Sequence, residues 1–83
     1  MKLESLIKNT FNLKDDINVL DTHGPGQLDG WDSLGNMRLF IAIEKTYQIS
    51  IAFEEIMIIK TVLDIKKLLG NKGVEVSWKN HLL

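Results

Sequence analysis

The sequence predicts an all-α fold: a small four-helix bundle of three main helices plus one short helix, with a long loop between helices 1 and 2. Apolar residues recur at helical spacing in residues 3–13, 33–47 and 61–69. Residues 14–32 lack this period and hold the only proline of the chain. The few stretches with alternating polarity are short and have no partner segment, so we expect no sheet.

The first helix is expected over residues 3–13, where apolar side chains share one face and Glu4 and Lys8 point the other way. The loop over residues 14–32 is rich in glycine and aspartate and also holds asparagine and threonine, all of which are frequent in turns. Its dispersed apolar residues are expected to hold it against the core, and they are Ile17, Val19, Leu20 and Leu28.

The second helix is expected over residues 33–47, which contain no proline and no glycine after Gly35. Its apolar residues cover more than half of the helix circumference, so we expect neighbours to contact it on more than one side. Glu44 falls within this apolar arc, where a carboxylate is unexpected. The polar residues gather on one arc and are Gly35, Arg38, Lys45 and Thr46.

A short helix is expected over residues 53–58, around Glu54 and Glu55, and the last helix over residues 61–69. Thr61 is a good N-cap for the last helix, because its side-chain oxygen can accept a hydrogen bond from a backbone N–H of the first turn.

Gly70 is the expected C-cap of the last helix. We therefore assign residues 1–70 to one folded domain and residues 71–83 to a C-terminal tail, extended or frayed. Hydrophobic residues make up 45% of the 83 residues, which suffices for the core of a single small domain.

Composition excludes several classes of function. A net charge of −1 argues against a nucleic-acid-binding module, which usually has a basic excess. The chain has no cysteine, and hence no disulfide or thiolate metal site. No apolar run approaches the roughly 20 residues that span a bilayer, and Glu4 comes too early for a secretory signal. We expect a cytoplasmic monomer with no membrane partner.

Ser33 is the candidate functional residue, because it places a hydroxyl where the loop meets the second helix. Serine is also among the best N-caps, so capping is the simpler interpretation of this residue alone. Its surroundings do not form the Gly-x-Ser-x-Gly elbow of a hydrolase. The two histidines, His23 and His81, are far apart in sequence and have no metal-ligand spacing. We expect neither catalysis nor a metal site.

Asp32, Ser33 and Leu34 match the phosphopantetheine attachment motif of the acyl carrier protein family, which the chain resembles over about residues 3–70. Aligned on Ser33, the pattern continues without a gap for some forty residues. The further matching positions are Ala42, Ile43, Glu44, Lys45, Tyr47, Ile49, Ile51, Thr61, Val62 and Ile65.

The resemblance implies a non-catalytic carrier. A phosphopantetheinyl transferase would attach 4'-phosphopantetheine from coenzyme A to Ser33, within the motif that Asp32 and Leu34 complete. The carrier would then hold acyl or aminoacyl thioesters for loading and processing enzymes of fatty-acid, polyketide or specialised metabolite biosynthesis. The alternative is a small helical protein-interaction module in which Ser33 is only an N-cap.

The resemblance also implies a docking surface for partner enzymes, and here the chain departs from the family. Familiar fatty-acid carriers have an acidic second helix that docks onto basic patches, whereas Gly35, Arg38 and Lys45 occupy positions where acids are usual. We therefore expect partners with a different charge. The candidate docking residues are Gly35, Met37, Arg38, Lys45, Glu54 and Glu55.

Overall fold

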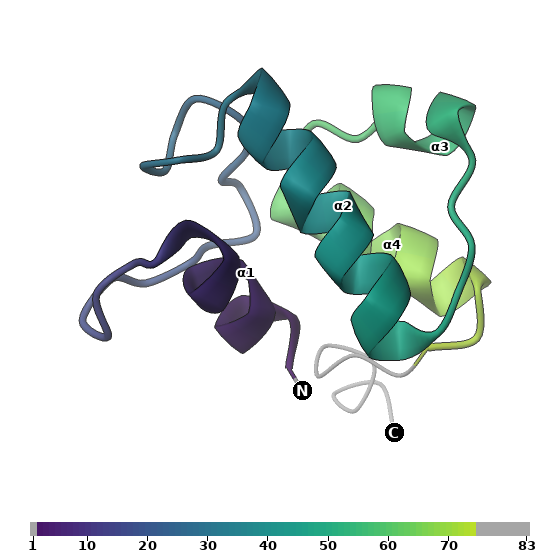
Figure 1. Ribbon diagram of the computed structural model, residues 1–83, viewed down its shortest axis with the longest axis horizontal. Helices are drawn as coiled ribbons and strands as arrows, with labels where there is room; N and C mark the ends of the chain where they lie inside the picture. The colour runs from purple at the N-terminus through teal and green to yellow at the C-terminus, as the bar shows by residue number, and fades with distance from the viewer. Residues whose placement is uncertain (1, 75–83) are drawn as a thin grey trace.

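The computed structural model describes residues 2–74. Its helices are α1 (Leu3–Phe11), α2 (Ser33–Tyr47), α3 (Phe53–Met57) and α4 (Val62–Asn71) (Figure 1). The described part of the chain contains no strand, and a long irregular connection joins α1 to α2. The predicted all-α fold, with three main helices, one short helix and a long first loop, is confirmed.

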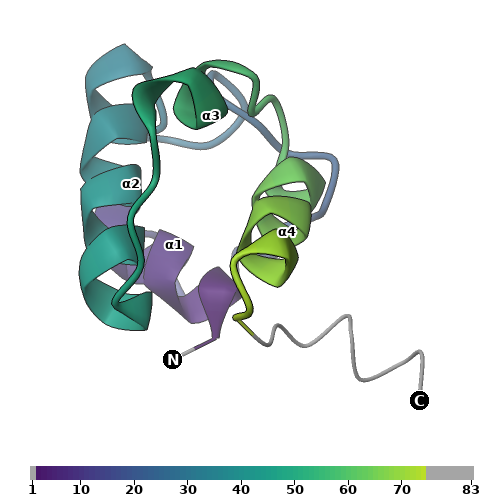
Figure 2. The same cartoon turned by 90° about the vertical axis from the view of Figure 1, so that its right-hand side faces the viewer.

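The helices enclose one core, and α1 packs against α2. After α2 ends, the connection to α3 runs back toward the end of the molecule where α2 begins (Figures 1 and 2). As a result, α3 lies at the same end of the bundle as the first turn of α2. The start of α2 and the short helix therefore share one end of the molecule.

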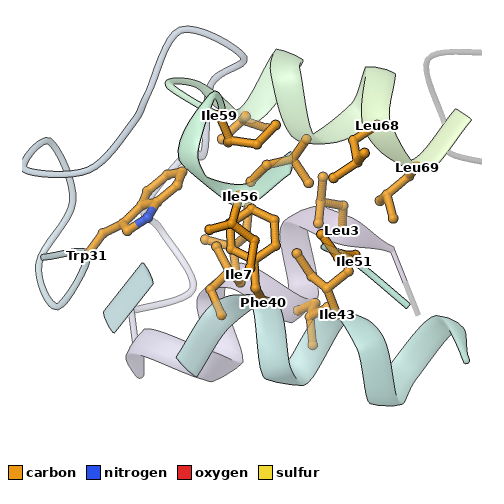
Figure 3. Close-up of a cluster of buried hydrophobic side chains, with 14 of the residues drawn as sticks. Leu3, Ile7, Trp31, Phe40, Ile43, Ile51, Ile56, Ile59, Leu68 and Leu69 are labelled. Atoms are coloured by element: carbon orange, nitrogen blue, oxygen red, sulfur yellow. The ribbon is translucent and has the colours of Figure 1, made fainter. Parts of the chain in front are cut away.

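The core is formed by apolar side chains from every helix (Figure 3). Phe40 and Ile43 of α2 are almost completely buried, as are Ile7 of α1 and Ile65 of α4. Burying a side chain of this size contributes roughly 1.5–3 kcal/mol relative to leaving it in water. The described residues include no buried polar or charged side chain. Apolar packing between α1, α2 and α4 thus holds the bundle together.

The outward side of α2 differs from the prediction. Leu34 is 72% exposed, Ile41 is 50% exposed and Met37 is also exposed. The expectation that neighbours contact this helix on more than one side is wrong for this arc. Leu39, Phe40 and Ile43 already fill the buried side, so the additional apolar residues of the helix face solvent.

Glu44, the carboxylate within the apolar arc, accepts hydrogen bonds from the connection between α2 and α3. Its Oε2 accepts a hydrogen bond from the backbone N–H of Ile51 at 2.9 Å. Its backbone oxygen accepts from the N–H of Gln48, which ends α2 in the left-handed conformation, and from the N–H of Ile49. The side chain is thus directed to an otherwise unpaired donor, which explains a polar residue beside the core.

The prediction for the start of α4 holds, whereas that for its end does not. The N-cap prediction is confirmed, because the Thr61 hydroxyl accepts from the backbone N–H of Asp64 at 3.2 Å. The C-cap prediction is wrong: Gly70 lies inside the helix, which continues to Asn71. Gly73, with φ of +83°, turns the chain away.

The end of α4 is a Schellman motif. The N–H of Gly73 donates to the oxygen of Gly70, and the N–H of Val74 donates to the oxygen of Leu69. Val74 also packs against the core. The first residues assigned to the tail therefore belong to the helix and its cap, while residues 75–83 lie outside the described residues.

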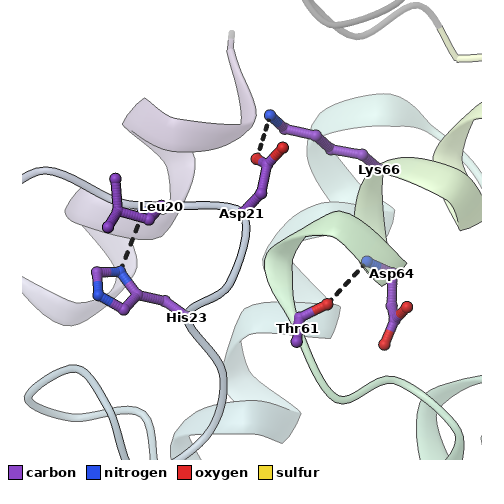
Figure 4. A network of polar contacts seen from close by, with 6 residues as sticks. All are labelled: Leu20, Asp21, His23, Thr61, Asp64 and Lys66. Carbon is purple, nitrogen blue, oxygen red and sulfur yellow. Dashed lines mark hydrogen bonds and ion pairs between the residues drawn. The ribbon is translucent and has the colours of Figure 1, made fainter.

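The long loop is attached to the start of α4 (Figure 4). The backbone oxygens of Asp21 and His23 accept from the N–H groups of Leu63 and Val62. The carboxylate of Asp21 also pairs with Lys66 at 2.6 Å. These contacts satisfy donors of the first turn of α4, which a helix cannot satisfy internally.

Apolar contacts hold the loop only in part, as the sequence predicted for some of its residues. Val19 and Leu28 pack against the core, whereas Ile17 and Leu20 remain exposed. Polar contacts to α4 therefore contribute to fixing the loop that leads to Ser33.

Candidate functional site

Ser33 is the first residue of α2 and is exposed. The N-cap is its neighbour Asp32, whose Oδ1 accepts from the backbone N–H of Gly35 at 2.7 Å. The interpretation of Ser33 as the cap is therefore wrong. No hydrogen bond among the described residues uses the Ser33 hydroxyl, which leaves it accessible for modification.

Trp31 anchors the chain immediately before the site. It is only 1% exposed, and its ring stacks on Phe11 of α1 with centroids 5.9 Å apart. Its Nε1 donates to Oδ1 of Asn36 at 2.9 Å, which links the loop to the first turn of α2. Its backbone oxygen accepts from the N–H of Gly26. Ser33 thus follows a segment that is fixed on both the loop side and the helix side.

Two glycines allow the loop and α2 to come close together. Gly30 has φ of +85°, a conformation that side chains disfavour. Gly35 is buried, and a Cβ at this position would collide with the backbone oxygen of Gly30 and approach the Phe11 ring. This contact brings the start of α2 onto the loop and α1.

The start of α2 can hold an anion beside Ser33. The N–H groups of Ser33 and Leu34 belong to the first turn of the helix, where no intrahelical acceptor exists. The first turn contains no acidic residue of its own. Free N–H groups and the positive end of the helix dipole favour a negatively charged group at this position.

The histidine that the structure describes has a structural contact. Nδ1 of His23 accepts from the backbone N–H of Leu20 at 3.0 Å, and its carbonyl oxygen binds α4 (Figure 4). His81 lies outside the described residues. Among residues 2–74, no group of three or more His, Asp or Glu side chains is arranged to hold a metal ion.

The predicted docking residues of α2 divide into two groups. Met37, Arg38 and Lys45 are exposed, as a docking surface requires. Gly35 is buried against Gly30 and Phe11, so its placement on the docking surface is wrong. The physical reason is that α2 needs a residue without a side chain where it crosses the loop.

The two acidic candidates on α3 also differ. Glu54 is exposed. Glu55 is bound within the molecule: its Oε1 accepts from the backbone N–H of Ala52 and from Nζ of Lys72, each at 2.9 Å. The hydrogen bond from Lys72 and that from Ala52 lower the pKa of the Glu55 carboxyl. Glu55 therefore connects α3 to the end of α4.

Further exposed apolar residues lie on and next to α3 and on α2. The sequence analysis did not include them in the candidate site. Phe53 is 60% exposed, and Met57 and Ile58 are exposed as well. On α2, the missed residue is Ile41. The sequence spacing could have identified Ile41, because residues 34, 38, 41 and 45 fall on one side of a helix and two of them were already docking candidates. The short α3 gave no comparable periodicity.

Comparison of the chain with protein-family models, with curated proteins and with solved structures gave no match. Within the described residues, none of the helices has the length and apolar character needed to cross a bilayer.

Proposed function

We propose that this protein is a carrier of acyl or aminoacyl intermediates, held as thioesters on a 4'-phosphopantetheine arm attached to Ser33. It serves fatty-acid, polyketide or specialised metabolite biosynthesis in the cytoplasm, without catalysis of its own. The observation that carries the proposal is that Asp32 caps α2, which leaves the exposed Ser33 hydroxyl without a structural hydrogen bond. The surrounding match to the carrier motif supplies the chemistry.

The residues around Ser33 fit this modification. The Ser33 oxygen would form a bond to the β-phosphorus of coenzyme A, while the bond to the adenosine bisphosphate leaving group breaks and a base of the transferase takes the hydroxyl proton. The phosphodiester would then lie beside the N–H groups of Ser33 and Leu34. Trp31 and Asp32, which directly precede Ser33, hold the end of the loop to the first turn of α2. The attached arm supplies the thiol that a chain without cysteine lacks.

The proposed partners are a phosphopantetheinyl transferase and the enzymes that load and process the carried group. Each must reach Ser33, and the exposed residues around it, including Leu34 and Met37, are available for contact. The carrier acts as a monomer in this proposal.

The test is the intact mass of the protein after incubation with coenzyme A and a broad-specificity phosphopantetheinyl transferase. Wild-type protein should gain the mass of one phosphopantetheine group, and Ser33→Ala should gain none while its circular dichroism spectrum is unchanged. Ser50→Ala, at an exposed serine in the connection after α2, is the matched control and should be labelled normally. Labelling of Ser33→Ala, or no labelling of wild type by any such transferase, would contradict the proposal.

The alternative is a helical protein-interaction module. The large exposed apolar side chains of α2 and α3 favour it, since a partner protein could bury them. In that case Ser33 is an unmodified surface residue rather than a cap, and the labelling experiment separates the two functions.

A further inference from the structure

The outward side of α2 combines apolar and basic side chains in one row. Steps of three or four residues keep Leu34, Arg38, Ile41 and Lys45 on one side of the helix. All four are exposed. Arg38 and Lys45 are separated by about 10 Å along the axis, at 1.5 Å per residue. We call these four residues the outward row of α2.

The positive charge of the outward row is not neutralised within the described residues. The ion pairs among them are Lys8–Glu4, Lys66–Asp21 and Lys72–Glu55. Among the described residues, the hydrogen bond of the Arg38 guanidinium goes to a backbone oxygen, that of Thr10, at 3.5 Å.

The acids nearest to the row in sequence are used elsewhere. The Asp32 carboxylate caps the helix, and the Glu44 carboxylate accepts from the backbone N–H of Ile51 in the connection after α2. The row therefore presents two cations beside apolar side chains, on a protein whose net charge is −1.

We infer that the outward row of α2 binds a partner protein whose contact surface carries aliphatic side chains flanked by Asp or Glu. Leu34 and Ile41 would supply the apolar contact, and Arg38 and Lys45 would orient the partner and speed association. This inference rests on the proposed function in one respect: Leu34 adjoins Ser33, so a protein bound here has access to the arm.

An anionic membrane is the other surface that attracts basic and apolar groups together. Recognition of anionic lipids typically uses clusters of about four to eight Lys or Arg. The outward row has two, and Glu54 is exposed on α3, a helix that lies at the end of the molecule where α2 begins. The charges favour a protein partner.

The experiment uses two synthetic helical peptides of about 20 residues, long enough to be helical in water. Both carry the same leucine stripe, flanked by Glu in one peptide and by Lys in the other. Each is titrated into the isotopically labelled full chain and followed by NMR. The Glu peptide should bind wild type at least about fivefold more tightly than the Lys peptide. The resonance shifts should centre on Leu34, Arg38, Ile41 and Lys45.

The variant Arg38→Glu with Lys45→Glu should reverse this preference. The control, Lys14→Glu with Lys67→Glu, changes the net charge equally at exposed positions on the loop after α1 and on α4, and should keep the wild-type preference. Equal affinity of wild type for both peptides, reversal in the control, or shifts centred elsewhere would overturn the inference.

A second arm tests vesicles of phosphatidylserine and phosphatidylcholine by sedimentation. No binding is expected, and binding that Arg38→Glu with Lys45→Glu abolishes would overturn the inference in favour of a membrane. Labelling of Ser33 is measured separately, so the two proposals fail independently. If Ser33 is labelled but the protein does not prefer the Glu peptide, only the docking inference is wrong. If Ser33 is not labelled but the protein prefers the Glu peptide, only the proposed carrier function is wrong.

Discussion

At the start of α2, two adjacent side chains have separate roles. The Asp32 carboxylate accepts from the N–H of Gly35, whereas the Ser33 hydroxyl is exposed and makes no hydrogen bond within the described residues. Helix capping and the proposed modification therefore depend on different residues. A change at Ser33 can remove the proposed attachment point without disturbing the helix.

This division predicts the stabilities of two variants. Asp32→Ala should lower the free energy of unfolding by about 1 kcal/mol, because the N–H of Gly35 loses its acceptor. Ser33→Ala should change it by less than about 0.5 kcal/mol, as expected for an exposed position without contacts. Urea unfolding followed by circular dichroism measures both. An equal or larger loss in Ser33→Ala would mean that Ser33 shares the capping.

At the scale of elements, the connection from α2 to α3 depends on Glu44. Replacement by Ala leaves the N–H of Ile51 without its partner, and an unsatisfied donor of this kind costs about 1–3 kcal/mol. Glu44→Gln keeps a side-chain oxygen at the same place and is the matched variant. We expect Glu44→Ala to be clearly less stable than Glu44→Gln in urea unfolding. Equal stabilities would show that water replaces the carboxylate.

The contact between α3 and the end of α4 has a pH dependence. The Lys72 ammonium and the N–H of Ala52 hold the pKa of Glu55 below its ordinary value of 4.5. A carboxyl with a depressed folded-state pKa stabilises the fold above its ordinary pKa, and this contribution disappears as pH falls through the folded-state pKa. The α3–α4 contact should therefore weaken in acid.

An NMR titration of the Glu55 side-chain carbon checks this assignment. Lys72→Gln should raise the pKa of Glu55 toward 4.5, since the largest cause of the shift is removed. Lys60→Gln removes a charge from an exposed residue before α4 and should leave the titration unchanged. An unchanged pKa in Lys72→Gln would show that Ala52 alone accounts for the shift.

For the whole molecule, periodicity sufficed to predict the three main helices and the irregular loop, because a buried stripe at helical spacing is required to form the core. Thr61 was identified as a cap from its residue type. Gly70 was not a cap, because Gly73, three residues later, offers the same left-handed conformation. Sequence alone cannot rank two glycines that close the same helix.

The candidate site was predictable in position but not in its internal contacts. Ser33 was found at the loop–helix junction, yet the choice of Asp32 over Ser33 as the cap depends on the tertiary position of the loop. The burial of Gly35 depends on the approach of Gly30 and Phe11, which are distant from it in the helical pattern. Contacts between separate elements decide these details, and periodicity carries no information about them.

The last prediction concerns the choice of partner by the whole molecule under the proposed carrier function. The outward row of α2 should repel the basic docking patch that partners of fatty-acid carriers present, because Arg38 and Lys45 are exposed and lack ion pairs among the described residues. Such charges act mainly on the association rate. Arg38→Glu with Lys45→Glu in the arm-bearing protein should therefore accelerate acyl transfer by a fatty-acid ketosynthase by up to about tenfold at low ionic strength.

The gain should shrink as added salt shortens the range of the interaction. The rate of acyl transfer at low and at moderate ionic strength is the measurement, with Lys14→Glu plus Lys67→Glu as the control of equal charge. Both double variants start from protein with the same degree of labelling at Ser33, so differences in the rate report docking. Equal rates for wild type and Arg38→Glu with Lys45→Glu would show that these two cations do not select the partner. A similar gain in the control would assign the effect to net charge, because its substitutions lie outside α2.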